Sequence, residues 1–389
     1  MSITYPGGFR AAGVAAGLKS TGTTDVALVA NDGPLHNAAA VFTSNRVAAA
    51  PVLWSRQVVS DGRVDAVILN SGGANACTGP EGFQNTHRTA EVTAELLGVS
   101  ATDVLVCSTG LIGEQLPMQK LLAGVTDAAG SLGRGGGPAA AEAIMTTDTV
   151  SKEARYPSTA DDASEGYAIG GMAKGAGMLA PGLATMLVVL TTDAALGADA
   201  LDAALREATR VSFDRTDADG CMSTNDTVVL LASGAAGIAP DQEQFTAALT
   251  GVCLDLAAQL IHDAEGASHT IAVTTINAAS ERDAEVASRA VARSNLFKTA
   301  IFGNDPNWGR VLAAVGTTDA AFEPDRLNVS MNGVQICRNG GIGDPRDLVD
   351  LTGREVTVEI DLAAGTSSAT IWTNDLTHEY VHENSAYSS

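Results

Sequence analysis

The stretch 170-GGMAKGAGMLAPGLA-184, continued by 185-TMLVVLTTD-193, decides the fold because a glycine-rich segment passes abruptly into an apolar one. Glycine and proline punctuate regular structure, so the residues before Thr185 predict a flexible loop, which we expect to be strained. Residues 186–190 are continuously apolar, which is typical of a strand buried on both faces. Thr185 therefore opens a buried strand. On this local pattern alone, a threonine that merely begins a strand is commoner than a catalytic one.

The rest of the chain alternates between strand-like and helix-like segments. The apolar runs 64-VDAVILN-70 and 103-DVLVC-107 predict strands, and 84-QNTHRTAEVTAELLG-98 predicts a helix. Residues 199–210 and 243–262 carry apolar side chains at helical spacing, with acids on the opposite face. This alternation predicts an α/β architecture.

Composition excludes several classes of function. The 389 residues carry a formal net charge of -22, which opposes binding to nucleic acid or to an anionic membrane. The five cysteines are widely spread and form no CxxC pair, so we expect reduced thiols and no thiolate metal site. The start, MSITYPGGFR, lacks the basic and apolar regions of a signal peptide, and no apolar run approaches the length of a membrane span. We therefore expect a cytoplasmic protein.

Short matches to metal motifs fail on their context. The segment 378-HEYVH-382 fits the HExxH pattern of zinc peptidases, but its surroundings predict a strand-like tail rather than the helix that two histidine ligands need. The segment 215-RTDADG-220 places Arg215 where a calcium loop needs an acid. The chain has no GxSxG, Walker A or GxGxxG motif. We expect no metal.

A series of phrases, in order along nearly the whole chain, resembles the ornithine acetyltransferase family, also called bifunctional glutamate N-acetyltransferase/amino-acid acetyltransferase. The central phrase is KGAGMLAPGLATMLVVLTTDA, which begins at Lys174 and is similar to the cleavage-site signature of that family. The others are 9-FRAAGVAAGLK-19, 42-FTSNRV-47, 70-NSGGANACTG-79, 107-CSTGLIG-113, 144-IMTTDT-149, 223-STNDT-227, 303-GNDPNWGR-310 and 378-HEYVHENSAYSS-389.

The resemblance implies an α+β sandwich of the ornithine acetyltransferase and self-cleaving aminopeptidase type, which cuts itself between Ala184 and Thr185. Residues 1–184 would form the α chain and residues 185–389 the β chain. Two of each would assemble into a heterotetramer.

The resemblance also implies the reaction. Thr185 would take acetyl from N2-acetylornithine and pass it to glutamate, giving ornithine and N-acetylglutamate. No cofactor is implied, although acetyl-CoA could serve as a second acetyl donor.

Site residues follow from the same resemblance. Thr109 and Gly110 would stabilise the oxyanion, Lys174 would bind a substrate carboxylate, and Glu265 would meet the δ-ammonium or handle protons. The full set expected to bind substrate is Thr147, Lys174, Thr185, Glu265, Asn384 and Ser389. We assign Asp305 and Arg310 of the GNDPNWGR phrase to structure, because Asp-Pro-Asn favours a turn.

Other functions stay open at this point. A self-cleaving amidohydrolase or aminopeptidase would need only water in place of glutamate. A specialised acetyltransferase of secondary metabolism is a variant of the first hypothesis. The alternative without catalysis is an uncut α/β binding protein.

Overall fold

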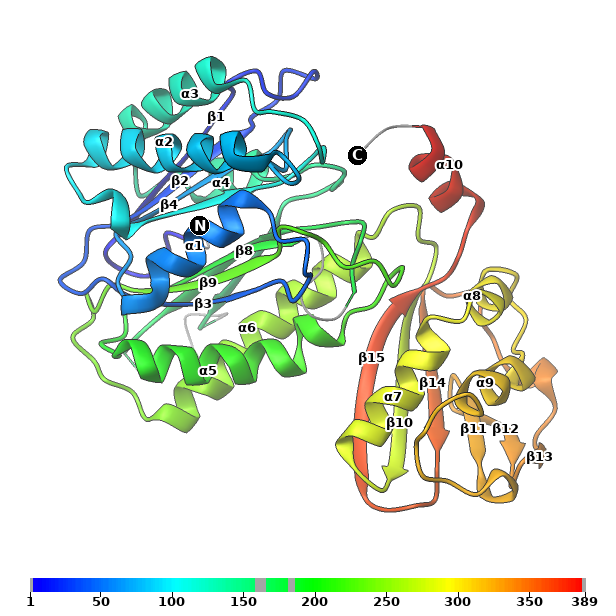
Figure 1. Cartoon of the computed structure of the whole chain (residues 1–389). Helices are drawn as coiled ribbons and strands as arrows, with labels where there is room; N and C mark the ends of the chain where they lie inside the picture. The colour runs from blue at the N-terminus through cyan, green and yellow to red at the C-terminus, as the bar shows by residue number, and fades with distance from the viewer. Residues whose placement is uncertain (1–2, 158–165, 181–185, 387–389) are drawn as a thin grey trace. The chain divides into compact units, whose positions relative to one another are not determined.

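The computed structural model describes residues 3–157, 166–180 and 186–386, and the chain forms two units, each with its own internal contacts. The first unit contains Met1–Asp214 and Cys221–Leu260, and the second contains Arg215–Gly220 and Ile261–Ser388. Figure 1 labels their helices and strands.

Two sheets form the middle of the first unit. The four-stranded sheet has the order β1-β2-β4-β5, from β1 Phe9–Val14, β2 Val26–Asn31, β4 Ala66–Asn70 and β5 Val104–Ser108. The five-stranded sheet has the order β3-β9-β8-β7-β6, from β3 Asn37–Phe42, β9 Thr227–Ala232, β8 Leu187–Thr192, β7 Ile169–Lys174 and β6 Lys152–Tyr156. The apolar run after Thr185 is therefore the central strand of its sheet, and every residue of β8 is buried, as the sequence predicts.

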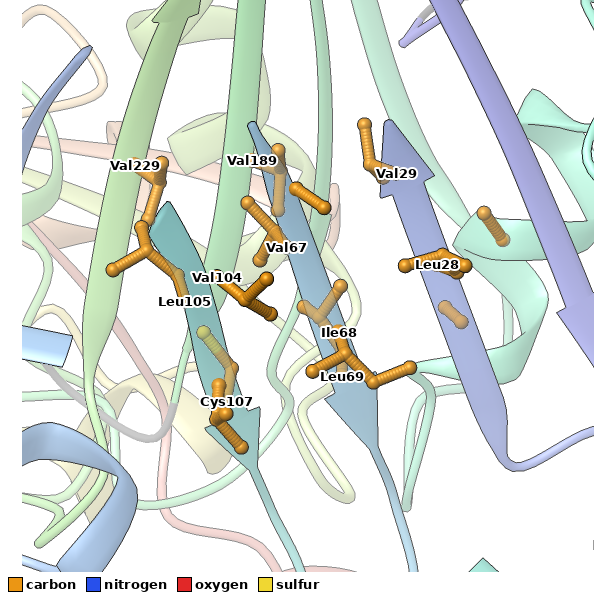
Figure 2. Close-up of a cluster of buried hydrophobic side chains, with 14 of the residues drawn as sticks. Leu28, Val29, Val67, Ile68, Leu69, Val104, Leu105, Cys107, Val189 and Val229 are labelled. Atoms are coloured by element: carbon orange, nitrogen blue, oxygen red, sulfur yellow. The ribbon is translucent and has the colours of Figure 1, made fainter. Parts of the chain in front are cut away.

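The two sheets pack face to face through aliphatic side chains. Figure 2 shows Leu28, Ile68 and Leu105 of the four-stranded sheet in one cluster with Val189 and Val229 of the five-stranded sheet. Helices cover the outer faces, so the unit is a layered α/β sandwich and the predicted fold class is confirmed (Figure 1). The helices of this unit are α1 Ala50–Val58, α2 Gly79–Leu97, α3 Met118–Gly130, α4 Gly137–Ala143, α5 Ala198–Val211 and α6 Gln242–His262.

Helix α6 is the one helix in the described part of the chain that is long and apolar enough to cross a membrane, judged by length and composition. Its apolar face is instead buried in the fold, at Phe245, Leu249 and Leu256. A Cβ atom added at Gly171 of β7 would lie 2.9 Å from Leu256 Cδ1, so glycine lets the helix approach the sheet. Helix α6 is thus a core helix of this unit.

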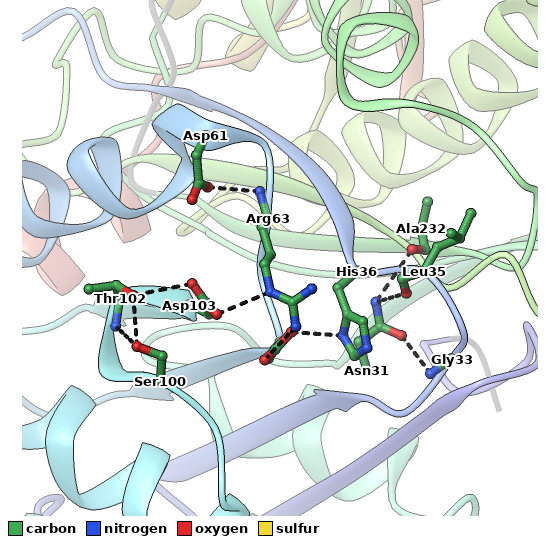
Figure 3. Close-up of polar contacts among 11 residues, drawn as sticks. Asn31, Gly33, Leu35, His36, Asp61, Arg63, Ser100, Thr102, Asp103 and Ala232 are labelled. Atoms are coloured by element: carbon green, nitrogen blue, oxygen red, sulfur yellow. Dashed lines mark hydrogen bonds and ion pairs between the residues drawn. The ribbon is translucent and has the colours of Figure 1, made fainter.

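Polar side chains fix the strands at one edge of the sandwich. The Arg63 guanidinium lies 2.7 Å from Asp65 and 3.1 Å from Asp103, just before β4 and β5 begin (Figure 3). His36 Nδ1 lies 2.8 Å from Asp65 Oδ1, and the Asn31 amide donates to the Leu35 carbonyl. This edge is occupied by structural contacts, which leaves the opposite ends of the strands for chemistry.

The second unit has one sheet of its own. Its strand order is β13-β12-β11-β14-β10-β15, and β10 pairs parallel with β14 and antiparallel with β15. The strands are β10 Thr270–Ala278, β11 Asn328–Met331, β12 Val334–Arg338, β13 Gly341–Ile342, β14 Glu355–Asp361 and β15 Ser367–Asn374. The helices are α7 Glu281–Ala292, α8 Asn295–Phe302, α9 Trp308–Val315 and α10 His378–Ala386.

The expectation of a strand-like tail around 378–382 is wrong, because these residues form α10. Thr377 explains the difference: its hydroxyl accepts the Tyr380 N–H at 3.0 Å, in the geometry of a helix N-cap. The β-favouring Tyr380 and Val381 suggested a strand, while the capping threonine before them sets the helix.

Candidate active site

Five strand ends meet at the edge of the sandwich opposite Arg63. Strands β4, β5 and β7 end there, and β8 and β9 begin there, because β7 runs antiparallel to β8 while β8 and β9 are parallel. Met186 directly precedes β8, so the chain leaves the proposed cleavage site at this edge. Ala184 and Thr185 themselves lie outside the described residues.

Lys174, the last residue of β7, is buried at this edge with only 1% of its surface exposed. Its Nζ donates to Thr146 Oγ1 at 2.7 Å and to Thr109 Oγ1 at 3.4 Å, the second being a long hydrogen bond. An ammonium group has donors and no acceptor, so the Thr109 oxygen must accept in this contact. The Thr109 hydroxyl proton is therefore directed away from Lys174.

Asp148 balances two buried lysines. One carboxylate oxygen accepts from Lys152 Nζ at 2.7 Å, and the other lies 3.9 Å from Lys174 Nζ. Burial alone would raise the pKa of Asp148, but the charges of Lys174 and Lys152 outweigh it and hold that pKa at about 2. Two cations facing one anion leave this part of the edge with positive charge, which favours an oxyanion.

Thr109 and Gly110 lie in the turn that follows β5. Thr109 is buried, and its backbone N–H donates to the Asn70 carbonyl at 3.0 Å. Gly110 has a φ of +131°, and a Cβ atom there would lie 2.5 Å from the Gly73 nitrogen. Only glycine fits this turn. The turn therefore explains the glycine of the CSTGLIG phrase. The Thr109 hydroxyl of the same phrase directs its proton away from Lys174.

Asn225 holds this turn in place, a role that the sequence analysis did not assign. Its amide Nδ2 donates to the Ser108 carbonyl at 2.9 Å and to the Ala74 carbonyl at 2.6 Å. One buried side chain from the STNDT phrase thereby ties together the turns after β4 and β5.

Asp226, the next residue, contacts the start of β8. Its Oδ1 accepts the Met186 N–H at 3.0 Å, and its Oδ2 is buried without a hydrogen-bond partner among the described residues. This contact joins the STNDT phrase to the residue that follows Thr185 in the sequence.

In the second unit, two of the predicted substrate-binding residues lie together. Asn384 Nδ2 donates to Glu265 Oε2 at 3.0 Å and also to the Tyr380 carbonyl, within α10. Burial raises the pKa of Glu383, and repulsion from Glu265 and Glu379 raises it further. This patch around Glu265 is thus negatively charged and suited to a cationic group.

The other predicted residues have mixed outcomes. Thr147 lies half-buried between Thr146 and Asp148, and it is Thr146 whose hydroxyl contacts Lys174. The repeated threonine in IMTTDT gave no signal for choosing between them. Ser389 lies outside the described residues. Lys174, which could have been an exposed charge on a glycine-rich loop, is a buried residue of β7.

The HExxH histidines lie on one helix after all, but within residues 3–157, 166–180 and 186–386 no group of three potential ligands gathers around a metal position. The GNDPNWGR phrase makes local structural contacts, and the assignment of Asp305 and Arg310 to structure stays a prediction. The Asn307 side chain caps α9 by accepting the Arg310 N–H at 3.3 Å, and Arg310 donates to the Leu296 carbonyl.

Comparisons with known proteins cover the whole chain. A family model described as the ArgJ family matches residues 10–389. The arginine biosynthesis bifunctional protein ArgJ of Streptomyces coelicolor is 64% identical over 389 residues, with all of both chains covered. The protein of the same name from Thermobifida fusca is 63% identical over the same span.

Solved structures also match parts of the chain. The ornithine acetyltransferase of Mycobacterium tuberculosis, solved with ornithine, is 54% identical over 48% of this chain and 96% of its own, with a TM-score of 0.44. The arginine biosynthesis bifunctional protein ArgJ of Bacillus halodurans is 32% identical over 51% of this chain and 97% of its own, with a TM-score of 0.48.

Proposed function

The chain belongs to the ArgJ family, and on that basis we propose that it transfers acetyl from N2-acetylornithine to glutamate in arginine biosynthesis, with Thr185 as the nucleophile. The observation that carries this proposal is the contact between Lys174 and Thr109. Because the Thr109 oxygen accepts from the ammonium, the Thr109 hydroxyl can donate its proton elsewhere, in positively charged surroundings. This hydroxyl lies at the edge of the sandwich where Met186, the residue after Thr185, begins the next segment.

Self-cleavage comes first. The Thr185 hydroxyl attacks the Ala184 carbonyl carbon, and its proton passes to the Thr185 nitrogen as the peptide bond breaks. The resulting ester is hydrolysed by water, which leaves a carboxylate on Ala184 and a free hydroxyl and α-amine on Thr185. A free α-amine titrates near ~8, against ~10.4 for lysine. A larger fraction of it is therefore neutral at physiological pH and able to take the hydroxyl proton.

Acetyl transfer then uses the same groups. The α-amine of Thr185 takes the hydroxyl proton as Oγ attacks the acetyl carbonyl of N-acetylornithine, and the proton leaves with the α-nitrogen of ornithine. Glutamate attacks the acetyl-Thr185 ester through its neutral α-amine, and Thr185 Oγ recovers a proton. This is a ping-pong reaction with one covalent intermediate.

The Thr109 hydroxyl and the Gly110 N–H would stabilise the oxyanion in each of these steps. Lys174 directs the Thr109 proton and supplies positive charge, while a direct contact with the substrate carboxylate stays a prediction. Thr147 and Ser389 likewise stay predicted substrate contacts.

The negatively charged patch around Glu265 supports ornithine as the leaving group. The ornithine side chain carries a δ-ammonium, and Glu265 with Asn384 offers oxygen acceptors for it. We assign Glu265 to binding this ammonium.

We propose that the α chain (1–184) and β chain (185–389) stay together and form a heterotetramer, and that the enzyme works in the cytoplasm without a cofactor. The two polypeptides share one sheet, because β7 before the cut pairs with β8 after it.

The proposed function is tested by incubating purified protein with N-acetylornithine and glutamate and measuring N-acetylglutamate. Acetyl-CoA with glutamate, run in parallel, shows whether a second donor is used. Formation of free acetate and ornithine without N-acetylglutamate would instead indicate an amidohydrolase. A single uncut band on a denaturing gel, with no turnover of either donor, would indicate a binding protein.

A further inference from the structure

Asp226 is a buried acid that the acetyl-transfer steps above do not use. It is fully buried directly before β9, and its backbone carbonyl accepts the Thr43 N–H at 3.0 Å. Its backbone is therefore fixed beside the sheet. Oδ1 accepts the Met186 N–H, and Oδ2 has no hydrogen-bond partner among the described residues.

A buried carboxyl group is costly even with the Ser223 hydroxyl nearby, so its position needs an explanation. Covalent geometry limits what Asp226 can reach. The Met186 nitrogen is bonded to the carbonyl carbon of residue 185 at about 1.33 Å. A carboxyl group that holds this nitrogen therefore lies within a few bond lengths of the atoms that react during cleavage.

The charge state of Asp226 follows from its surroundings. Burial raises the pKa of Asp226 well above its ordinary value, and the negative charge of Asp214 adds to this. The Met186 amide, the positive charge of Lys174 and the nearby Ser223 hydroxyl oppose the shift without cancelling it. The direction of this shift favours the protonated form of Asp226, while Oδ1 stays in use as the acceptor of the Met186 N–H.

We propose that Asp226 is a positioning residue for the acyl transfer: through Oδ1 it holds the amide directly after Thr185, and so fixes the start of the strand that follows the nucleophile. The inference rests on the proposed function for the identity of the nucleophile. Asp226 acts by positioning Met186. This role differs from that of the oxyanion donors Thr109 and Gly110 and from that of the α-amine base.

Two substitutions of Asp226 with side chains of similar shape separate the role of its oxygens from the role of its side-chain volume. Asp226→Asn keeps an oxygen acceptor and an N–H donor, and we expect cleavage and kcat within about threefold of the wild type. Asp226→Leu keeps the branched shape and removes both groups. We expect it to slow cleavage and lower kcat by about a hundredfold, with KM within about threefold, because the nucleophile is misplaced.

Asp193 provides the matched control at the other end of β8. Its carboxylate accepts the Gly7 N–H at 2.9 Å and the Ala168 N–H at 2.7 Å, so it also anchors backbone beside the same strand. We expect Asp193→Leu to lower the melting temperature while its folded fraction cleaves at the wild-type rate. If anchoring β8 were all that mattered, Asp193→Leu and Asp226→Leu would slow cleavage equally.

The experiment follows cleavage over time in freshly translated protein, and then measures kcat, KM and the pH profile of the mature enzymes. Wild-type cleavage of Asp226→Leu overturns the proposal, and so does an Asp226→Asn variant as slow as Asp226→Leu, because Asn keeps an oxygen that can accept the Met186 N–H. If Asp226→Leu does not fold, the smaller Asp226→Ala, which also removes the acceptor, takes its place. Slow cleavage and a lowered kcat in Asp226→Ala support the positioning role, whereas wild-type rates overturn it.

Cleavage and acetyl transfer of the wild-type chain, measured beside these variants, distinguish failure of the proposed function from failure of the Asp226 proposal. A wild-type chain that cuts itself but transfers no acetyl overturns the proposed function and leaves the cleavage ratios to test Asp226. An uncut wild-type chain overturns both.

Discussion

The ammonium of Lys174 donates to the hydroxyl oxygen of Thr109, although the two residues lie 65 positions apart in the chain. Lys174 ends β7 of one sheet, and Thr109 directly follows β5 of the other. The same ammonium makes a shorter hydrogen bond to Thr146. The consequence is a Thr109 proton that is free for another acceptor. This separates a catalytic role of Thr109 from the purely local one of closing a turn.

Thr109→Val should slow cleavage and acetyl transfer together, each by about a hundredfold or more, because one oxyanion donor typically contributes about 3 to 4 kcal/mol. The melting temperature should change little, since bulk is conserved and Lys174 keeps Thr146 as an acceptor. Thr109→Ser, which keeps the hydroxyl, is the control. Normal rates of both reactions in Thr109→Val would make Thr109 a turn residue only.

Cleavage before residue 185 should yield two fragments, and the N-terminus of the second fragment identifies the cleavage site. N-terminal sequencing of the β chain should give TMLVV. Thr185→Ala should stay uncut and inactive, and Thr185→Ser should keep partial function because it keeps a hydroxyl. Any other N-terminus would refute the assigned nucleophile.

The two fragments should remain associated after the cut. Strand β7 pairs with β8 from Ile169↔Thr192 to Lys174↔Leu187, so separation would expose the middle of a sheet. We expect both fragments to elute together in gel filtration and to separate only in denaturant. Light scattering should give the mass of two αβ pairs, and a single pair would contradict the larger assembly.

Periodicity and apolar runs predict much of the first unit. Helix α2 begins at Gly79 and contains nearly all of the predicted helix over 84–98, and β8 is the buried strand expected after Thr185. These predictions succeed because burial on one helix face or on both strand faces leaves its mark on neighbouring residues.

Contacts between distant segments were beyond such reasoning. No local pattern distinguishes Thr146 from Thr147, or marks Asn225 as the residue that ties two turns together. Asp226 stood in a recognised phrase, but its unpaired oxygen is visible only once β8 and β9 are placed side by side. The helix at 378–386 could have been predicted from Thr377, whose hydroxyl caps it.

Changes at the Glu265 patch should affect binding more than stability. Asn384→Ala and Glu265→Gln should raise KM for N-acetylornithine about tenfold or more, because an ammonium loses a charged or oriented acceptor. KM for glutamate should change less, since glutamate has no δ-ammonium. Glu355→Gln, an exposed change on β14 of the same unit, is the control. Equal effects on both KM values would argue against a site for the ammonium.

Asp148 should make the free energy of unfolding depend on pH in a defined direction. Its folded pKa of about 2 lies below the ordinary 3.8, so its contribution is complete above the ordinary value and is lost as the pH falls toward 2. Asp148→Asn removes the carboxylate that the ammoniums of Lys152 and Lys174 share, and should destabilise the protein by about 3 to 5 kcal/mol at pH 7. The difference from the wild type should shrink between pH 4 and pH 2, as measured by urea unfolding at each pH. Asp127→Asn, at an exposed position of α3, should stay within about 0.5 kcal/mol throughout. A difference between wild type and Asp148→Asn that is equal at neutral and acid pH would mean that Asp148 is not held ionised by the two lysines.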